Sequence, residues 1–142
     1  MEKEKQIITV HTTVNAPVTK VWEYWTKPAH IIKWNSASDD WHTPRAENDL
    51  RAGGHFTARM EAKDGSMGFD FGGTYDEVRD NEYIGYTLAD GRKVKVDFTA
   101  NGDSTEVVES FDAEAENSIE MQQGGWQAIM NSFKKYTEAN GG

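Results

Sequence analysis

The chain has 142 residues and no cysteine, and its 24 acidic against 15 basic residues give a net charge of −9. The lack of cysteine excludes disulfides, thiolate zinc sites and thiol nucleophiles, and the negative charge makes nucleic acid and anionic membranes poor partners. No apolar run approaches the roughly 20 residues that span a bilayer, and the first five residues carry both charge signs, unlike a signal peptide. We therefore expect a cytoplasmic protein with a single domain over residues 1–142.

The N-terminal segment predicts one strand followed by two short helices. Apolar and polar residues alternate from Ile8 to Val14, which indicates a strand with one buried face. Pro17 suits the first turn of a helix, and apolar residues follow at helical spacing up to Trp25. Pro28 ends this helix and opens a second short one.

The middle of the chain predicts an antiparallel meander. The segment from Asn35 to Gly54 is polar and irregular, with a strand around Trp41–Ala46. Beyond it, apolar residues recur with a period of two, and turn-forming pairs such as Asp90-Gly91 and Asn101-Gly102 separate the runs. The expected strands cover residues 55–61, 67–78, 84–88, 94–98 and 107–111.

The C-terminal segment has helical periodicity from Ile119 to Tyr136. Asn117 followed by Glu120 resembles a capping box at its start. Gly124-Gly125 lowers helix propensity by about 1 kcal/mol per residue, which predicts a close approach or a bend of the helix there. Strand, two helices, meander and long helix together predict an α+β fold, in which helices cover one face of an antiparallel sheet.

Four stretches of the chain resemble, in the same order, the START-like helix-grip superfamily. They are NAPVTKVWEYWT, NDLRAGGHFTARMEAKDGS, GGTYDEV and GGWQAIMNSFKKY. Within that superfamily they are most similar to bacterial single-domain relatives of the activator of the ninety-kilodalton heat-shock protein ATPase. The resemblance implies a curved sheet of six or seven antiparallel strands around the long C-terminal helix. It also implies an apolar cavity between them for a lipid, a flavonoid or a polyketide-like molecule.

Because of this resemblance, we interpret the inward-facing apolar residues as a candidate ligand site. Methionine and aromatic side chains make adaptable linings, and ligand pockets are mostly apolar with a few placed polar groups. The alternative is that the same residues only form a packed core. The candidate cavity residues are Trp34, His42, Phe56, Met60, Phe69, Phe71, Tyr86, Val96, Phe98, Glu109, Trp126, Ile129, Met130 and Phe133.

Two polar residues of this set have alternatives that the sequence leaves open. His42 follows Asp39 and Asp40, so it either forms a general base with a carboxylate or lies at the rim of the fold. Glu109 is in phase with its apolar neighbours, so its carboxylate points to the covered face. There it pairs with an arginine or anchors a polar ligand group, unless it lies at the sheet edge in water.

Three functions follow as hypotheses. The first is a binding protein in which Trp126 and Phe69 pack against an apolar ligand, with Tyr86 or His42 orienting its polar end. The second is a cyclase-like or hydrolase-like enzyme that uses His42 with Asp40 or Glu109. The third is a chaperone-modulating protein that acts through its acidic surface. The histidine spacing matches no metal motif and no catalytic motif is present, so we expect no metal and no cofactor, a binding protein rather than an enzyme, and a monomer or weak homodimer.

Overall fold

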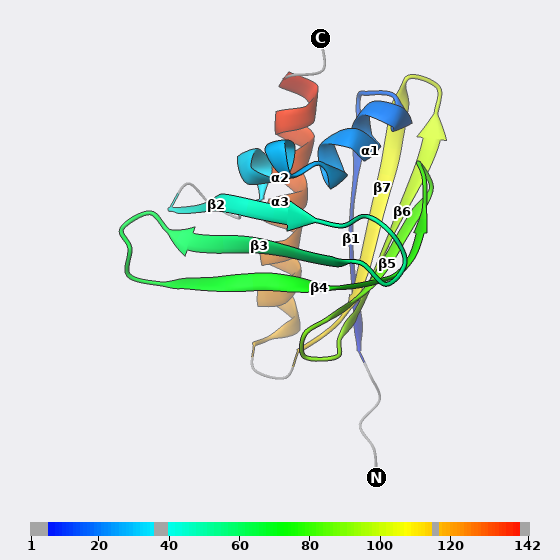
Figure 1. Cartoon of the computed structure of the whole chain (residues 1–142). Coiled ribbons are helices and arrows are strands. Elements are labelled where there is room, and N and C mark those ends of the chain that lie inside the picture. Colours follow the sequence, from blue (N-terminus) through cyan, green and yellow to red (C-terminus); the bar gives the residue numbers. More distant parts are fainter. Residues whose placement is uncertain (1–5, 36–39, 115–116, 140–142) are drawn as a thin grey trace.

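The computed structural model describes residues 6–35, 40–114 and 117–139. Seven strands form one antiparallel sheet in the order β1-β7-β6-β5-β4-β3-β2, and the long helix α3 lies against its concave side (Figure 1). The predicted α+β helix-grip fold is therefore confirmed. Its elements are β1 (Ile7–Val14), α1 (Val18–Thr26), α2 (Pro28–Trp34), β2 (Trp41–Asn48), β3 (His55–Ala62), β4 (Gly68–Arg79), β5 (Tyr83–Leu88), β6 (Lys93–Asn101), β7 (Ser104–Asp112) and α3 (Ile119–Ala139).

The polar segment that the sequence marks as irregular contains an edge strand of the sheet. β2 runs to Asn48, where it pairs with Phe56 of β3, two residues beyond the expected end at Ala46. Because β2 is the last strand in the sheet order, much of it stays exposed. Edge strands of this kind need no apolar alternation, so periodicity did not reveal the full length of β2.

The sheet curls around α3, and two glycines of β4 permit close approach between strands. In Figure 1, β2, β3 and the first part of β4 run across the view, whereas β1, β6 and β7 run along α3. A Cβ atom on Gly72 would lie 2.5 Å from the carbonyl oxygen of Phe56, and one on Gly73 would lie 2.3 Å from that of Thr87. No side chain fits in so little space, so glycine at both positions lets the neighbouring strands approach closely where the sheet bends.

One part of the molecule, which we call the packed half, consists of β1, β6, β7, α1, α2 and the C-terminal half of α3. Helix α3 packs closely on β1, and also contacts α1 and α2. Phe133 of α3 is fully buried, and its ring centroid lies 4.8 Å from that of Trp25 and 4.9 Å from that of Trp34. Aromatic edge-to-face contacts of this kind fill the space between the helices and the sheet.

The start of α3 differs from the predicted capping box. The hydroxyl oxygen of Ser118 accepts a hydrogen bond from the backbone N–H of Met121 at 3.1 Å, so Ser118 caps the helix. Asn117 instead donates to the carboxylate of Glu114. Among the helices of the described residues, none is long and apolar enough to cross a membrane.

Candidate ligand-binding cavity

A cavity of about 470 Å³ lies between the concave face of the sheet and the N-terminal half of α3. It exists because α3, which packs closely on β1, makes at most isolated contacts with β2 to β5. Phe69 and Met121 line the cavity and are 48% and 65% exposed, so the cavity opens to solvent beside them. Its volume falls within the range of about 300–1,000 Å³ that is usual for small-molecule sites.

Most of the residues predicted for the site line this cavity. Trp126 forms part of its helical wall, where its indole ring stacks on Phe111 with ring centroids 3.8 Å apart. Phe71 meets the same indole edge-on at 6.1 Å. The predicted residues that line the cavity are Trp34, Phe56, Met60, Phe69, Phe71, Tyr86, Glu109, Trp126 and Ile129.

Four apolar residues of the predicted set do not line the cavity. Phe98, Met130 and Phe133 are buried in the packed half, where the helices cover the sheet. Val96 lies in register between Ile84 and Glu109, both of which reach the cavity, but Val96 is fully covered. The periodicity of the strands and of the helix correctly predicted that these residues point inward. Periodicity does not show which part of the inner face is packed against the helices and which part borders the cavity.

His42 was predicted at the cavity, and the structure has it elsewhere. Its side chain is 44% exposed, and its Nε2 atom lies 3.8 Å from a carboxylate oxygen of Glu61 on the neighbouring strand. Asp40 is exposed, and Asp39 lies outside the described residues. His42 therefore forms no acid–base pair with Glu109, and within residues 6–35, 40–114 and 117–139 no cluster of three potential metal ligands occurs.

Glu109 lies on the covered face, which excludes the alternative that its carboxylate lies in water at the sheet edge. On β7 it stands between Val10 of β1 and Val96 of β6, and both valines are fully buried. Its side chain is 6% exposed and lines the cavity. Burial raises the pKa of the Glu109 carboxyl to about 8, because the charged form loses its hydration. At neutral pH this carboxyl is largely protonated.

Two tyrosines lie on the same wall as Glu109. Burial raises the pKa of the Tyr86 hydroxyl well above its usual range, and the nearby Glu109 raises it further. Tyr75, which sequence analysis did not include, donates its hydroxyl hydrogen to Asn48 Oδ1 at 2.6 Å, and Asn48 donates in turn to the carbonyl of Thr26. The signal for Tyr75 was present, since it continues the strand phase of Phe71.

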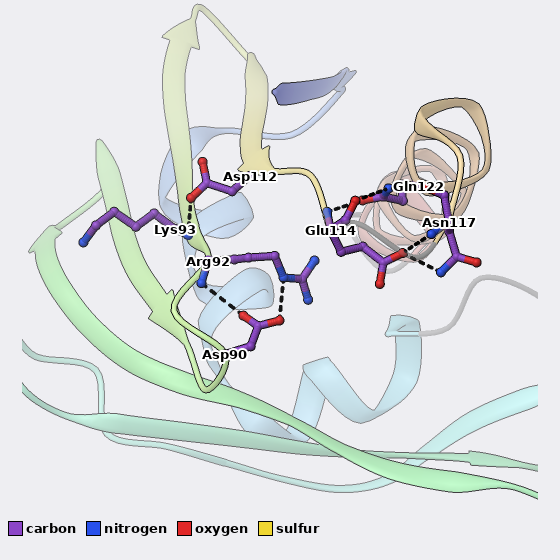
Figure 2. A network of polar contacts seen from close by, with 7 residues as sticks. All are labelled: Asp90, Arg92, Lys93, Asp112, Glu114, Asn117 and Gln122. Atoms are coloured by element: carbon purple, nitrogen blue, oxygen red, sulfur yellow. Dashed lines mark hydrogen bonds and ion pairs between the residues drawn. The ribbon is translucent and has the colours of Figure 1, made fainter. Parts of the chain in front are cut away.

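Charged and amide groups gather at one end of the cavity (Figure 2). The backbone N–H and Nε of Arg92 donate to Asp90, and the free end of the guanidinium points toward Glu114. Gln122 of α3 accepts from the backbone N–H of Glu114 at 2.8 Å and donates to two carbonyls of the same segment. Since Arg92, Glu114 and Gln122 also line the cavity, this end is polar, whereas Phe56, Phe71 and Trp126 form apolar walls.

The glycine pair of α3 makes no close contact, so the predicted close approach is wrong. A Cβ atom on either Gly124 or Gly125 would have no neighbouring heavy atom within 4 Å. The helix continues without interruption through both residues. Gly125 lines the cavity, whereas Gly124 is exposed to solvent on the outside of the helix. A side chain at position 125 would occupy cavity space.

Comparisons with known proteins agree with this architecture. The model of the family described as Activator of Hsp90 ATPase homolog 1-like protein matches residues 15–138. An AHSA1-like protein from Aeromonas hydrophila is 42% identical over 96% of this chain and 94% of its own, with a TM-score of 0.90. A protein from Cytophaga hutchinsonii is 62% identical over 94% of this chain and 92% of its own, with a TM-score of 0.81. No curated protein matches the chain in sequence.

Proposed function

Since the chain belongs to the Activator of Hsp90 ATPase homolog 1-like family, we propose that it binds an apolar or aromatic small molecule in the cavity between the sheet and α3. The observation that carries the proposal is the unfilled space of about 470 Å³ bounded by large aromatic side chains. Side chains of this size normally interdigitate and fill a protein interior. A space that they enclose without filling it is suited to a ligand.

The shape of the cavity favours a ligand with an apolar body and few polar groups. Phe56, Phe71 and Trp126 form its walls, and Trp126 is held rigidly by its stack on Phe111. Because Gly125 has no side chain, the helix leaves more room for a ligand at this position. Alanine would also fit there and would favour the helix, so neither packing nor helix formation requires the glycine. A lipid, a flavonoid or a polyketide-like molecule has the required character.

Binding is preferred over catalysis because the groups that the enzyme hypothesis requires are apart. His42 lies outside the cavity and faces Glu61. Tyr86, a titratable neighbour of Glu109, holds its proton even more firmly than free tyrosine does. The Glu109 pKa of about 8 would suit a general base, but no second titratable side chain of the described residues hydrogen-bonds to Glu109 to complete an acid–base pair.

The proposal is tested by titrating the protein with a panel of lipids and flavonoids while following the indole N–H signals by NMR. Trp126 lines the cavity, whereas Trp22 packs on Phe98 outside it and serves as an internal control. We expect a bound ligand to shift the Trp126 signal and to leave the Trp22 signal nearly unchanged. The proposal fails if no member of the panel shifts Trp126, or if both indoles shift alike.

A further inference from the structure

Glu109 is a buried acid in an otherwise apolar row of the sheet. It is 6% exposed, and its register neighbours on both sides are valines. The Glu109 oxygens accept no hydrogen bond from the described residues. In this part of the chain, the Thr137 hydroxyl is the only side-chain polar atom that lacks a partner and is also shut off from solvent. The Glu109 oxygens are therefore not sealed in, and they face the cavity that Glu109 lines.

No cation of the described residues compensates the Glu109 carboxylate. A nearby arginine or lysine would lower the pKa of the carboxyl, whereas burial alone acts on it and raises it to about 8. Of the other titratable side chains around the cavity, Tyr86 is buried like Glu109. The rest are hydrogen-bonded or more exposed: Tyr75, which donates to Asn48, Glu47 on the exposed strand β2, and Arg92 and Glu114 at the polar end.

The interior of the cavity therefore offers donors and few acceptors. The side-chain amides of Asn48 and Gln122 already form hydrogen bonds within the protein. The Tyr86 hydroxyl and the Glu109 carboxyl both carry a proton at neutral pH and have no acceptor among the described residues. A buried polar group without a partner destabilises the fold, and a ligand that supplies the partner removes that penalty.

We propose that Glu109 donates the O–H of its protonated carboxyl to a neutral oxygen acceptor, such as a ketone or ester carbonyl, on an apolar ligand. The ligand class is thus an apolar skeleton with an uncharged carbonyl, rather than a carboxylate or an amine. A carboxylate ligand would bring a second negative charge into a site without a cation. An ammonium ligand could form an ion pair only after Glu109 had released its proton to solvent. This inference rests on the proposed binding function.

The test uses four probes with one skeleton: ethylnaphthalene, methyl naphthyl ketone, naphthoate and naphthylmethylamine. Affinities are measured by NMR or fluorescence titration at about pH 6 and about pH 9, on either side of the Glu109 pKa. At the lower pH we expect the ketone to bind roughly tenfold more tightly than ethylnaphthalene, which corresponds to one hydrogen bond. At the higher pH this advantage disappears, because the carboxylate can no longer donate.

Three variants separate the donor from the charge. Glu109→Gln keeps an N–H donor, so the ketone preference persists and loses its pH dependence. Glu109→Leu removes the donor, so the ketone preference is lost while ethylnaphthalene still binds. Glu106→Gln is the matched control, because Glu106 is an exposed carboxylate on the same strand and does not line the cavity, and it leaves the preference and its pH dependence unchanged.

The outcomes distinguish this inference from the function on which it rests. If ethylnaphthalene binds and the ketone has no advantage at either pH, the role of Glu109 is wrong and the cavity function stands. If the amine binds best and improves as the pH rises, Glu109 is a cation site and the inference is overturned. If no probe binds to the wild-type protein, both proposals fail. The wild-type pH comparison needs no variant, so it remains decisive even where a substitution disturbs folding.

Discussion

The packed half and the cavity half of the molecule contain the same types of apolar side chain. These side chains form a closed core in the first half and line an open cavity in the second. We call the part formed by β2 to β5 and the N-terminal half of α3 the cavity half. In the packed half, Phe133 is fully buried between Trp25 and Trp34. In the cavity half, Phe71 is half-buried and Phe69 is exposed, although both share a strand face with the buried Tyr75.

The difference lies in what covers the sheet and not in the strands themselves. Helix α3 packs closely on β1, and its C-terminal half also meets α1 and α2, whereas its first turns stand away from β3 and β4. An apolar strand face that a helix covers becomes core, and the same face without close cover becomes the wall of a cavity. The two halves therefore respond differently to the same substitution.

The largest expected effect is the loss of Phe133. Phe133→Ala removes a fully buried ring from the packed half and leaves a void, so we expect the free energy of unfolding to fall by about 3–5 kcal/mol. Phe71→Ala enlarges a space that is already open, so no new void is created. We expect the free energy of unfolding to fall by about 1–2 kcal/mol, because only the burial of the ring is lost. Urea denaturation of both variants beside the wild type measures the difference. Equal losses would contradict the division into two halves.

Glu109, which lies on β7 of the packed half but faces the cavity, makes the stability of the fold depend on pH. Its pKa is about 8 in the folded protein against 4.5 ordinarily, so the folded state binds the proton more tightly than the unfolded state does. The resulting stabilisation is complete below pH 4.5 and is lost as the pH rises toward 8. We expect the wild type to lose stability relative to Glu109→Gln by up to about 1.4 kcal/mol per pH unit within this window.

Urea denaturation at several pH values measures this slope, and other titratable groups cancel because both proteins share them. Glu47→Gln serves as the control, since Glu47 is an exposed carboxylate at the same cavity. Its stability should run parallel to that of the wild type. Parallel curves for the Glu109→Gln variant as well would show that the carboxyl is hydrated in the folded protein.

Strand phase, turn residues and the resemblance to the helix-grip superfamily were sufficient to predict the fold. β1 alternates as predicted, with Ile8, Val10 and Val14 buried, and Pro28 opens α2. The capping box was wrong because Ser118, one residue after Asn117, takes the capping position. The sequence offers several polar residues there, and only the path of the chain into α3 selects one of them.

The candidate site was predictable only as far as phase determines it. Phase put Glu109 and Phe56 on the inner face, where they line the cavity. It also put Phe98 and Met130 on the inner face, but both are buried where the helices pack against the sheet. Which inward residues face open space depends on where α3 approaches the sheet, and that distance is set by contacts between segments far apart in the chain.

The smallest expected effect on stability, and the sharpest on binding, comes from the glycine pair of α3. Leucine at either Gly124 or Gly125 should raise the free energy of unfolding by about 0.5–1 kcal/mol, because leucine favours the helix and a Cβ meets no atom within 4 Å at either site.

Only Gly125 lines the cavity, so Gly125→Leu fills ligand space and should weaken the binding of an apolar probe at least about tenfold. Gly124→Leu is the matched control and should leave that affinity unchanged. Thermal or urea denaturation and probe titration of the two variants measure both effects. Equal binding by both would mean that the ligand lies elsewhere, whereas a loss of stability in Gly125→Leu alone would mean that α3 approaches the sheet more closely than the cavity allows.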